Sequence, residues 1–286
     1  MATVSMRGVI DMHVHTSPDL RARTYDDFEL CDAAVRVGAR AIVIKSHLGS
    51  TAERAVLANR YNRLVHGENG FTMFGSLTLN RCVGGINPVA VEHALKLGAK
   101  VIWLPTQSAR RHLEMTGQAA DGAVDVVREG RIVPELEDVL SLIREHGAVL
   151  GTGHIAPAEA FVVARAARRM GVEKIVVTHP EWWIVGMSVG DQLRLVREYG
   201  VVLERCFAQN MGGGRYKSNL PDNLAIIRAA GYQNVLVDTD GGQKENPNWE
   251  VAMRTYMQYL LDNGVGQEAL CFMTHELPCR LLGIEA

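Results

Sequence analysis

Three ionisable side chains alternate at the end of an apolar run near the start of the chain. Asp11, His13 and His15 occupy every second position in the segment VIDMHVH. Side chains two residues apart in a β-strand point to the same face, so His13 and His15 should face the same way. Neutral imidazole and carboxylate groups suit divalent first-row metal ions. The spacing therefore predicts part of a metal site where a buried strand ends.

Polar residues also end later apolar runs that are predicted as strands. Side chains at the carboxyl ends of the strands of an α/β barrel converge on one face, where active sites form. The residues concerned are Lys45 and His47, His154, His179, Glu204, and Asp238 with Asp240. Five strand-end histidines and an aspartate exceed the needs of one ion that keeps a position open. We therefore predict two divalent ions, zinc or manganese with iron as an alternative, held by His13, His15, His47, His154, His179 and Asp240.

A hydroxide that bridges two such ions is a nucleophile at neutral pH. Any single strand-end histidine could instead be a hydrogen-bonded structural residue, so the prediction rests on the whole set. The other histidines lie on predicted helices or loops and receive no ligand role: His66, His93, His112, His146 and His275.

Short β-branched runs alternate with amphipathic segments along the whole chain. Strands are predicted within residues 8–14, 41–47, 72–79, 100–106, 148–154, 174–180, 201–207 and 234–240. Helices are predicted at 25–38, 52–67, 88–99, 134–147, 157–171, 189–200, 220–231 and 249–264. Alternation of this kind indicates a parallel sheet, because each return needs a crossover helix. Eight such units predict an α/β protein with a (β/α)8 barrel, and a doubly wound sheet is the alternative.

We predict one domain over residues 1–286, since no low-complexity linker divides the chain. The segment 106–133 is a long insertion after the fourth predicted strand. Insertions of this length in a compact domain are usually functional or mobile, so a lid over the barrel is predicted.

The composition limits the kinds of partner. Lys and Arg number 30 against 32 Asp and Glu, and this balance gives no general attraction to nucleic acid or membranes. The N-terminal residues lack the apolar region of a signal peptide, and no run approaches 18 apolar residues. Five cysteines without a CxxC pair are typical of reduced thiols, which favours a cytoplasmic protein. Homo-oligomerisation stays open.

The sequence resembles the amidohydrolase superfamily of metal-dependent barrels. The resemblance lies in DMHVH, GTGH, VVTHPE and VDTDGG, and in the closing THELPCRLLGI, which is similar to a helix that often ends these chains. It spans about residues 7–284. The combination of VIKSH, GTGHIAP and VVTHPE is most similar to a bacterial branch described only as amidohydrolase-like.

The resemblance implies ligand roles for individual residues. It implies that His13, His15 and Asp240 hold one ion, and that His154 and His179 hold the other. DTD resembles the ETD of TatD-like nucleases, which favours Asp240 over Asp238. Many members bridge the ions with a carboxylated Lys or a Glu on strand four, but WLPTQ offers neither. A carboxylated Lys45 or Glu204 could substitute, while His47 resembles the polymerase and histidinol phosphatase family.

The predicted loops above the barrel carry cations. Guanidinium groups pair bidentately with carboxylate or phosphate, so an anionic substrate is predicted; solvated arginines, or pairs with Asp26, Asp27 and Glu114, are the alternative. Trp182 could wall an apolar part of the substrate or simply pack. The predicted substrate-binding residues are Arg21, Arg23, Arg110, Arg111, Arg215 and Trp182.

Together these features predict a hydrolase that cleaves an amide, lactone or ester-like bond of a small anionic substrate. Asp240 would act as base and then proton donor, with Lys45 and Glu204 as the other candidate catalytic residues. A phosphoesterase is an alternative with the same residues. A two-iron oxygenase on this barrel is another, and a non-enzymatic binding protein is the third.

Overall fold

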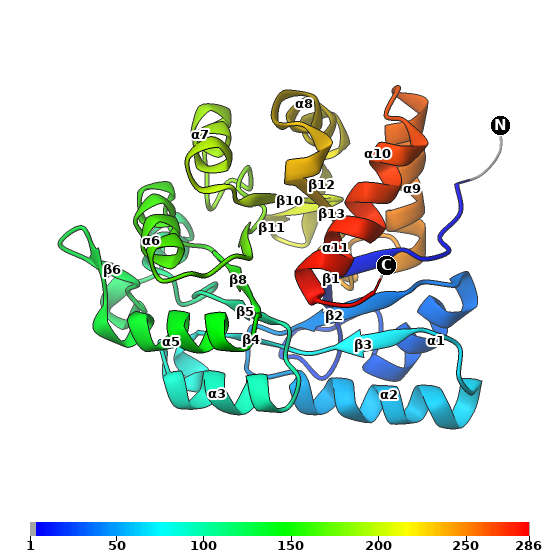
Figure 1. Cartoon of the computed structure of the whole chain (residues 1–286), viewed down its shortest axis with the longest axis horizontal. Coiled ribbons are helices and arrows are strands. Elements are labelled where there is room, and N and C mark those ends of the chain that lie inside the picture. Colours follow the sequence, from blue (N-terminus) through cyan, green and yellow to red (C-terminus); the bar gives the residue numbers. More distant parts are fainter. Residues whose placement is uncertain (1–3, 286) are drawn as a thin grey trace. The chain divides into compact units, whose positions relative to one another are not determined.

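The computed structural model describes residues 4–285, and the chain divides into two units. The first unit holds residues 4–45, 53–75 and 205–285, and the second holds residues 46–52 and 76–204. Strands alternate with helices along both, as expected of a parallel α/β protein (Figure 1). Neither unit is one continuous segment, because the chain passes from one to the other after Lys45, Ala52, Gly75 and Glu204.

The sheet of the first unit is built around the strand with the histidine pair. β1 (Ile10–His15), β2 (Ala41–Lys45) and β3 (Thr72–Phe74) are parallel and lie in that order. β13 (Val235–Asp238) lies beside β1, where Val14 bridges to Gly241. β1 and β2 are buried along their whole length, as expected of strands covered on both faces.

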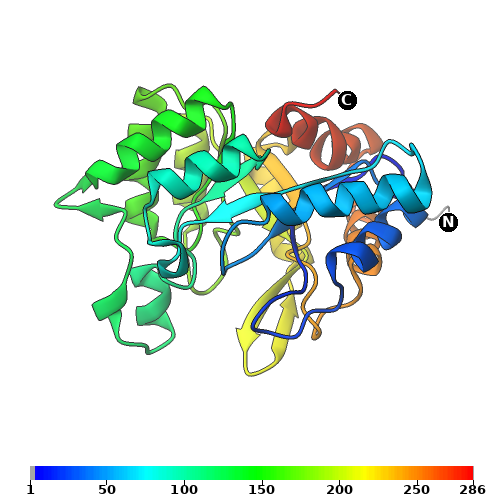
Figure 2. The same cartoon turned by 90° about the horizontal axis from the view of Figure 1, so that it is seen from below.

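Helices and one hairpin complete the first unit. The helices are α1 (Asp27–Val37), α2 (Ala52–His66), α8 (Leu220–Ala230), α9 (Trp249–Asp262), α10 (Gln267–Cys271) and α11 (Leu277–Leu282), with a π-helical turn at Phe272–Glu276 and a 3-10 turn at Tyr232–Asn234. β11 (Ala208–Gly212) and β12 (Arg215–Ser218) form an antiparallel hairpin that projects from its unit (Figure 2). Their buried side chains share one apolar core, which includes Leu30, Ile42, Met73 and Trp249.

Local sequence explains where α1 begins and ends. The Asp26 side chain accepts hydrogen bonds from the backbone N–H groups of Phe28 and Glu29, and Glu29 accepts one from Asp26 in return. Gly38 ends the helix in a left-handed conformation, with φ of 75°. The short turn that follows leads directly into β2.

The second unit contains its own parallel sheet. β4 (Ser76–Thr78), β5 (Val101–Trp103), β8 (Val149–Gly151), β9 (Ile175–Val177) and β10 (Val202–Cys206, whose last two residues belong to the first unit) lie in that order. The helices are α3 (Pro88–Lys96), α4 (Arg110–Met115), α5 (Pro134–Glu145), α6 (Pro157–Arg169) and α7 (Val189–Tyr199), with 3-10 turns at Arg81–Val83 and Ala120–Gly122. β6 (Val127–Arg128) and β7 (Arg131–Ile132) form a short hairpin.

Two predicted segments differ in detail from the observed elements. The strand predicted at 72–79 is two strands, because β3 pairs with β2 and β4 pairs with β5, with Gly75 between them. The insertion 106–133 contains α4, a 3-10 turn and the β6–β7 hairpin. Its role as a lid, and the single domain, remain predictions. Within residues 4–285, every helix is too short or too polar to cross a membrane.

Candidate metal centre

Two imidazoles and one carboxylate meet in the first unit. Asp240 Oδ1 lies 3.2 Å from His13 Nε2 and 3.2 Å from His15 Nε2. Both histidines are buried, and the side chain of Asp240 is 20% exposed. Ligand atoms around a tetrahedral ion with bonds of about 2.0–2.1 Å lie roughly 3.3 Å apart. The separations in this cluster, which we call the His13–His15–Asp240 cluster, therefore fit one ion.

The backbone at Asp240 has an unusual conformation. Its φ is 48°, in the left-handed region that non-glycine residues seldom adopt. Such strain persists where the surroundings determine it, and it concentrates at functional sites. The two aspartates of this segment face different groups, since Asp238 Oδ1 accepts a hydrogen bond of 2.7 Å from Met12 N. Of the two, Asp240 is the one that faces the imidazoles.

Asp11 anchors the end of β13 to β1. It is fully buried, and its carboxylate accepts hydrogen bonds from Thr239 Oγ1 at 2.6 Å, Trp249 Nε1 at 2.8 Å and His13 N at 3.0 Å. β1 has one residue more than β2 between Asp11 and Val14, which is a bulge. A bulge re-aims neighbouring side chains and is common next to active sites. Asp11 thus binds the residue next to Asp240.

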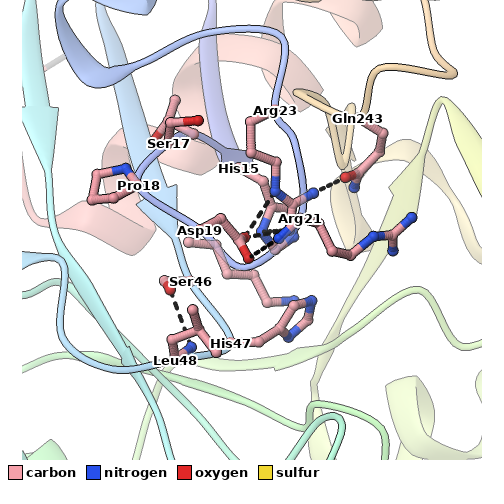
Figure 3. Close-up of polar contacts among 12 residues, drawn as sticks. His15, Ser17, Pro18, Asp19, Arg21, Arg23, Ser46, His47, Leu48 and Gln243 are labelled. Atoms are coloured by element: carbon pink, nitrogen blue, oxygen red, sulfur yellow. Dashed lines mark hydrogen bonds and ion pairs between the residues drawn. The ribbon is translucent and has the colours of Figure 1, made fainter.

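Two cations lie beside the histidine pair. Lys45 Nζ, buried on β2, is 2.8 Å from His13 Nε2. Arg23 is also buried, with one guanidinium nitrogen 3.4 Å from His15 Nδ1 (Figure 3). Arg23 donates to Asp19 Oδ2 at 2.6 and 2.8 Å and also to Gln243 Oε1. Arg23 is therefore held by neighbouring protein groups.

Burial and neighbouring groups shift the pKa values of His15 and Asp240. Burial lowers the pKa of His15 well below its usual value, and the Arg23 charge adds to this effect. Burial alone would raise the pKa of Asp240, but the His13 and His15 interactions outweigh it and hold the pKa well below its usual range. Asp240 is therefore an anion at neutral pH beside neutral His15.

The second unit has a cluster of four imidazoles, which we call the imidazole cluster: His47, His112, His154 and His179. The His154 ring centroid is 5.1 Å from that of His179 and 5.8 Å from that of His47. Trp182 lies 4.8 Å from His154 and 5.0 Å from His179, edge-on to both. His179 has a left-handed backbone, with φ of 23°.

His112 belongs to this cluster, although no ligand role was predicted for it. Its ring stacks on His154 at 5.0 Å, and the two Nδ1 atoms are 2.9 Å apart. Burial lowers the pKa of His112 to about 4, so it is neutral at neutral pH. His112 lies on α4 within the insertion, and no strand-end position marks it in the sequence.

Glu204 and His47 are each bound by groups of the second unit. Glu204, buried on β10, accepts a hydrogen bond of 3.1 Å from the backbone N–H of His179. His47 Nδ1 is 2.8 Å from Thr106 Oγ1. Asn80 links these two residues, since its side-chain amide donates hydrogen bonds to both His47 O and Thr106 Oγ1.

The predicted substrate arginines differ in their surroundings. Arg110 pairs with Asp125 at 3.0 Å, and Arg111 donates to Ile184 O at 2.8 Å. Arg21 is 46% exposed and lies 3.8 Å from Glu245. Arg215, on the exposed hairpin, lines a small hollow with Asp240, Tyr216 and Asn246. Arg21 and Arg215 are thus the more open of the set in the first unit.

Comparison with known proteins places this chain in a family. The model of a family of unknown function, DUF6282, matches residues 8–204. The chain belongs to this family. The DUF6282 match includes both histidines of β1 and all four members of the imidazole cluster, whereas Asp240 follows it. No curated protein matches the sequence.

Solved structures resemble this DUF6282 chain over nearly its whole length. An amidohydrolase from Pseudomonas aeruginosa has a TM-score of 0.67 at 12% identity, covering 96% of this chain and 95% of that one. A dihydroorotase from Campylobacter jejuni has a TM-score of 0.59 at 15% identity, covering 99% and 85%. An organophosphorus hydrolase from Deinococcus radiodurans has a TM-score of 0.58 at 13% identity, covering 98% and 93%. The likeness is one of fold, and it confirms the predicted (β/α)8 barrel.

Proposed function

We propose that this chain is a metal-dependent hydrolase that cleaves an amide, lactone or ester-like bond of a small anionic substrate. The observation that carries the proposal is the convergence of His13 Nε2 and His15 Nε2 on Asp240 Oδ1. Proteins of similar fold are named as an amidohydrolase, a dihydroorotase and an organophosphorus hydrolase. Each of these names is that of a hydrolytic enzyme, which supports the proposed reaction class.

Two ions are proposed, one for each cluster. His13, His15 and Asp240 would hold the first, and His154 with His179 would hold the second. Divalent ions such as zinc or manganese, when bound, supply activated water and polarise the bond to be cleaved. His47 and His112 are additional donors for the second ion, because both rings lie against His154.

Asp240 is proposed to move the proton. Its Oδ1 faces both imidazoles and accepts a hydrogen bond of 3.2 Å from Gln243 Nε2. No described residue donates to its other carboxylate oxygen, and the side chain is partly exposed. This oxygen can take a proton from water and pass it to the leaving group. The low pKa of Asp240 keeps the carboxylate ready for the first of these steps.

We propose an anionic substrate because Arg215 and Arg21 are available to bind a negatively charged group. Arg215 shares its hollow with Asp240, so an anion bound there would lie beside the proposed proton acceptor. Among the described residues, the Arg21 side chain pairs only with exposed Glu245, at 3.8 Å, and such pairs contribute little to stability. Lys45 and Glu204 are proposed as positioning groups, since they contact His13 and the His179 backbone respectively.

The test is elemental analysis of protein purified without chelator. We expect two equivalents of zinc or manganese. A His13→Ala/His15→Ala variant should lose one equivalent, and a His154→Ala/His179→Ala variant should lose the other. His66→Ala and His93→Ala are matched controls, because both histidines lie on helices outside the clusters, and they should keep the full metal content.

The identity of the bound metal and assays with a panel of substrates then distinguish a hydrolase from an oxygenase. Hydrolysis of lactones, amides or esters by the metal-loaded protein, lost in Asp240→Asn, would support the proposal. Iron with O₂ consumption would favour the oxygenase instead. Wild-type protein that takes up no metal after reconstitution would contradict the proposal altogether.

A further inference from the structure

The second unit has a groove whose use the proposed function leaves unexplained. It measures about 800 Å³ and lies among β7, the start of α5 and the second half of α6. Pockets for small molecules typically measure about 300–1,000 Å³. The charged residues that line it are Arg131, Arg165, Arg169 and Glu137.

Its three arginines are unpaired within the part of the chain that the structure describes. All three are exposed, and their side chains make no ion pair or hydrogen bond with any residue of the described range 4–285. Nearby arginines of the same unit are engaged. Arg168 donates to the carbonyl oxygens of Tyr199 and Gly200, and Arg144 pairs with Glu145. The groove thus presents three cations against a single carboxylate.

Arg165 and Arg169 on α6 repel each other, and within residues 4–285 neither makes an ion pair that would offset this repulsion. Residues 162, 165, 166 and 169 lie on one face of the helix, next to the face that the core covers. Arg165 and Arg169 are therefore neighbours one turn apart, and like charges at this spacing destabilise a helix. An anion bound between them would remove that repulsion.

The β6–β7 hairpin places the third arginine next to α6. Glu129 and Gly130 both have positive φ, 50° and 74°, as a two-residue type I′ hairpin turn requires. Arg131 directly follows this turn on β7, and β7 contacts α6. Apolar groups of Ile132, Val162 and Met170 also line the groove, beside the three arginines.

The groove is separate from the imidazole cluster of its own unit. His154 precedes α6, whereas Arg165 and Arg169 lie in its last two turns. With a rise of about 1.5 Å per residue, the eight steps from Pro157 to Arg165 alone span roughly 12 Å.

We propose that this groove binds a small organic phosphate, of the class of nucleoside diphosphates. Guanidinium forks match phosphate oxygens, and two phosphates could span the three arginines. The apolar side chains would contact the carbon skeleton of the same ligand. Because this site uses none of the metal-cluster residues, it can be tested independently of the proposed hydrolase activity.

Calorimetric titration of the full-length protein with ADP tests the proposal. We expect saturable binding of one ADP that weakens as KCl is raised, because salt screens exposed charges. Adenosine and inorganic pyrophosphate should each bind more weakly than ADP, since each offers only one of the two kinds of contact. The Arg165→Gln/Arg169→Gln variant should lose at least about tenfold in affinity, and Arg131→Gln should also weaken binding.

Two controls make the outcome specific. Arg197→Gln removes another exposed arginine of the same unit and should bind ADP like the wild type. Arg215→Gln changes the hollow beside Asp240 and should also leave ADP affinity unchanged. The Arg165→Gln/Arg169→Gln variant should melt no lower than the wild type, which excludes misfolding as the cause of lost binding.

Three results would overturn the proposal. The first is ADP affinity that the Arg165→Gln/Arg169→Gln variant retains. The second is loss of ADP binding in Arg215→Gln, which would move the ligand to the other unit. The third is binding of an acidic peptide by a protein that ignores ADP, which would make the groove a protein-docking surface.

Discussion

Asp11 shows how one buried side chain can position a site that it does not join. Its carboxylate accepts hydrogen bonds from Thr239 and Trp249. The bond to Thr239 fixes the residue directly before Asp240. Trp249 N–H and His13 N–H cannot turn away to find other acceptors. Asp11 therefore has to remain an acceptor on both oxygens, which an amide cannot do.

We expect Asp11→Asn to lower the free energy of unfolding by about 2–3 kcal/mol, because a buried donor would face other donors. Metal content should fall with it, since the Asp240 turn loses its anchor. Urea denaturation and elemental analysis measure the two effects. For comparison, Thr239→Ser keeps the hydroxyl and should behave like the wild type, whereas Thr239→Val should resemble Asp11→Asn. Wild-type stability in Asp11→Asn would show that the anchor is dispensable.

Cys31 gives a pH-dependent prediction outside the metal clusters. Burial, with the Asp32 charge as a second cause, raises the pKa of the Cys31 thiol to about 12. A raised folded-state pKa means that the contribution to stability is full below the unfolded pKa of about 9 and is lost as pH rises toward 12. The free energy of unfolding should therefore fall above pH 9, by at most about 1.4 kcal/mol per pH unit from this group.

The matched comparison for that prediction is the slope in Cys31→Ala, which should be shallower above pH 9. The native thiol of Cys31 should also resist iodoacetamide at pH 8.5, whereas exposed Cys271 should react. Equal slopes in the two proteins would contradict the assigned cause.

At the level of elements, alternation within one strand predicted that His13 and His15 share a face, because that property is local. The split of residues 72–79 at Gly75 was not predictable, since an apolar run does not reveal which partner each half will pair with. His112 was missed for a similar reason. Its contact with His154 depends on how the insertion folds back, and no periodicity encodes that.

The surroundings of each arginine also determine whether it can reach a substrate. Arg23 is predicted to bind the substrate, but a loop sequence cannot show that Asp19 and Gln243 hold its guanidinium group in a buried position. Its role in binding substrate remains a prediction, as do those of Arg110, Arg111 and Trp182. The apolar runs predicted the strands that carry His13, His15 and Lys45, whereas the loop sequences did not show which arginines are buried or paired.

The loop after β13 approaches β1 so closely that only glycine fits at residue 242. Gly242 has φ of 90°, and a Cβ there would lie 1.8 Å from the backbone oxygen of His15. We expect Gly242→Ala to separate β1 from this loop, destabilise the protein by more than about 2 kcal/mol and reduce metal content. Thermal melting and elemental analysis report both effects.

Gly264→Ala separates strain from collision in that experiment. Gly264 has φ of 86°, but no atom of residues 4–285 lies within 4 Å of the position that a Cβ would take, so only the backbone strain applies. It should cost less than Gly242→Ala and leave metal content unchanged. Equal effects of the two variants would show that the approach to His15 is not the cause.

For the whole molecule, chain connectivity bears on cooperativity. The chain passes between the units four times, after Lys45, Ala52, Gly75 and Glu204, so each unit is assembled from separated segments. We expect the single predicted domain to unfold in one calorimetric transition, because the strands of the first unit come from three separate stretches of chain, with the second unit between them in the sequence. Removal of metal by chelator should lower that transition, since ions bound only to the folded state stabilise it. Two resolved transitions would instead define two domains.

Trp182 gives the imidazole cluster an optical signal. The centroid of the indole ring lies 4.8 Å from that of His154 and 5.0 Å from that of His179. A protonated imidazole quenches the fluorescence of an adjacent indole by electron transfer. Proton or ion binding at His154 or His179 should therefore change the emission of this tryptophan. Occupancy of the cluster could then be followed in real time without a label, and a Trp182→Phe variant would lack the signal.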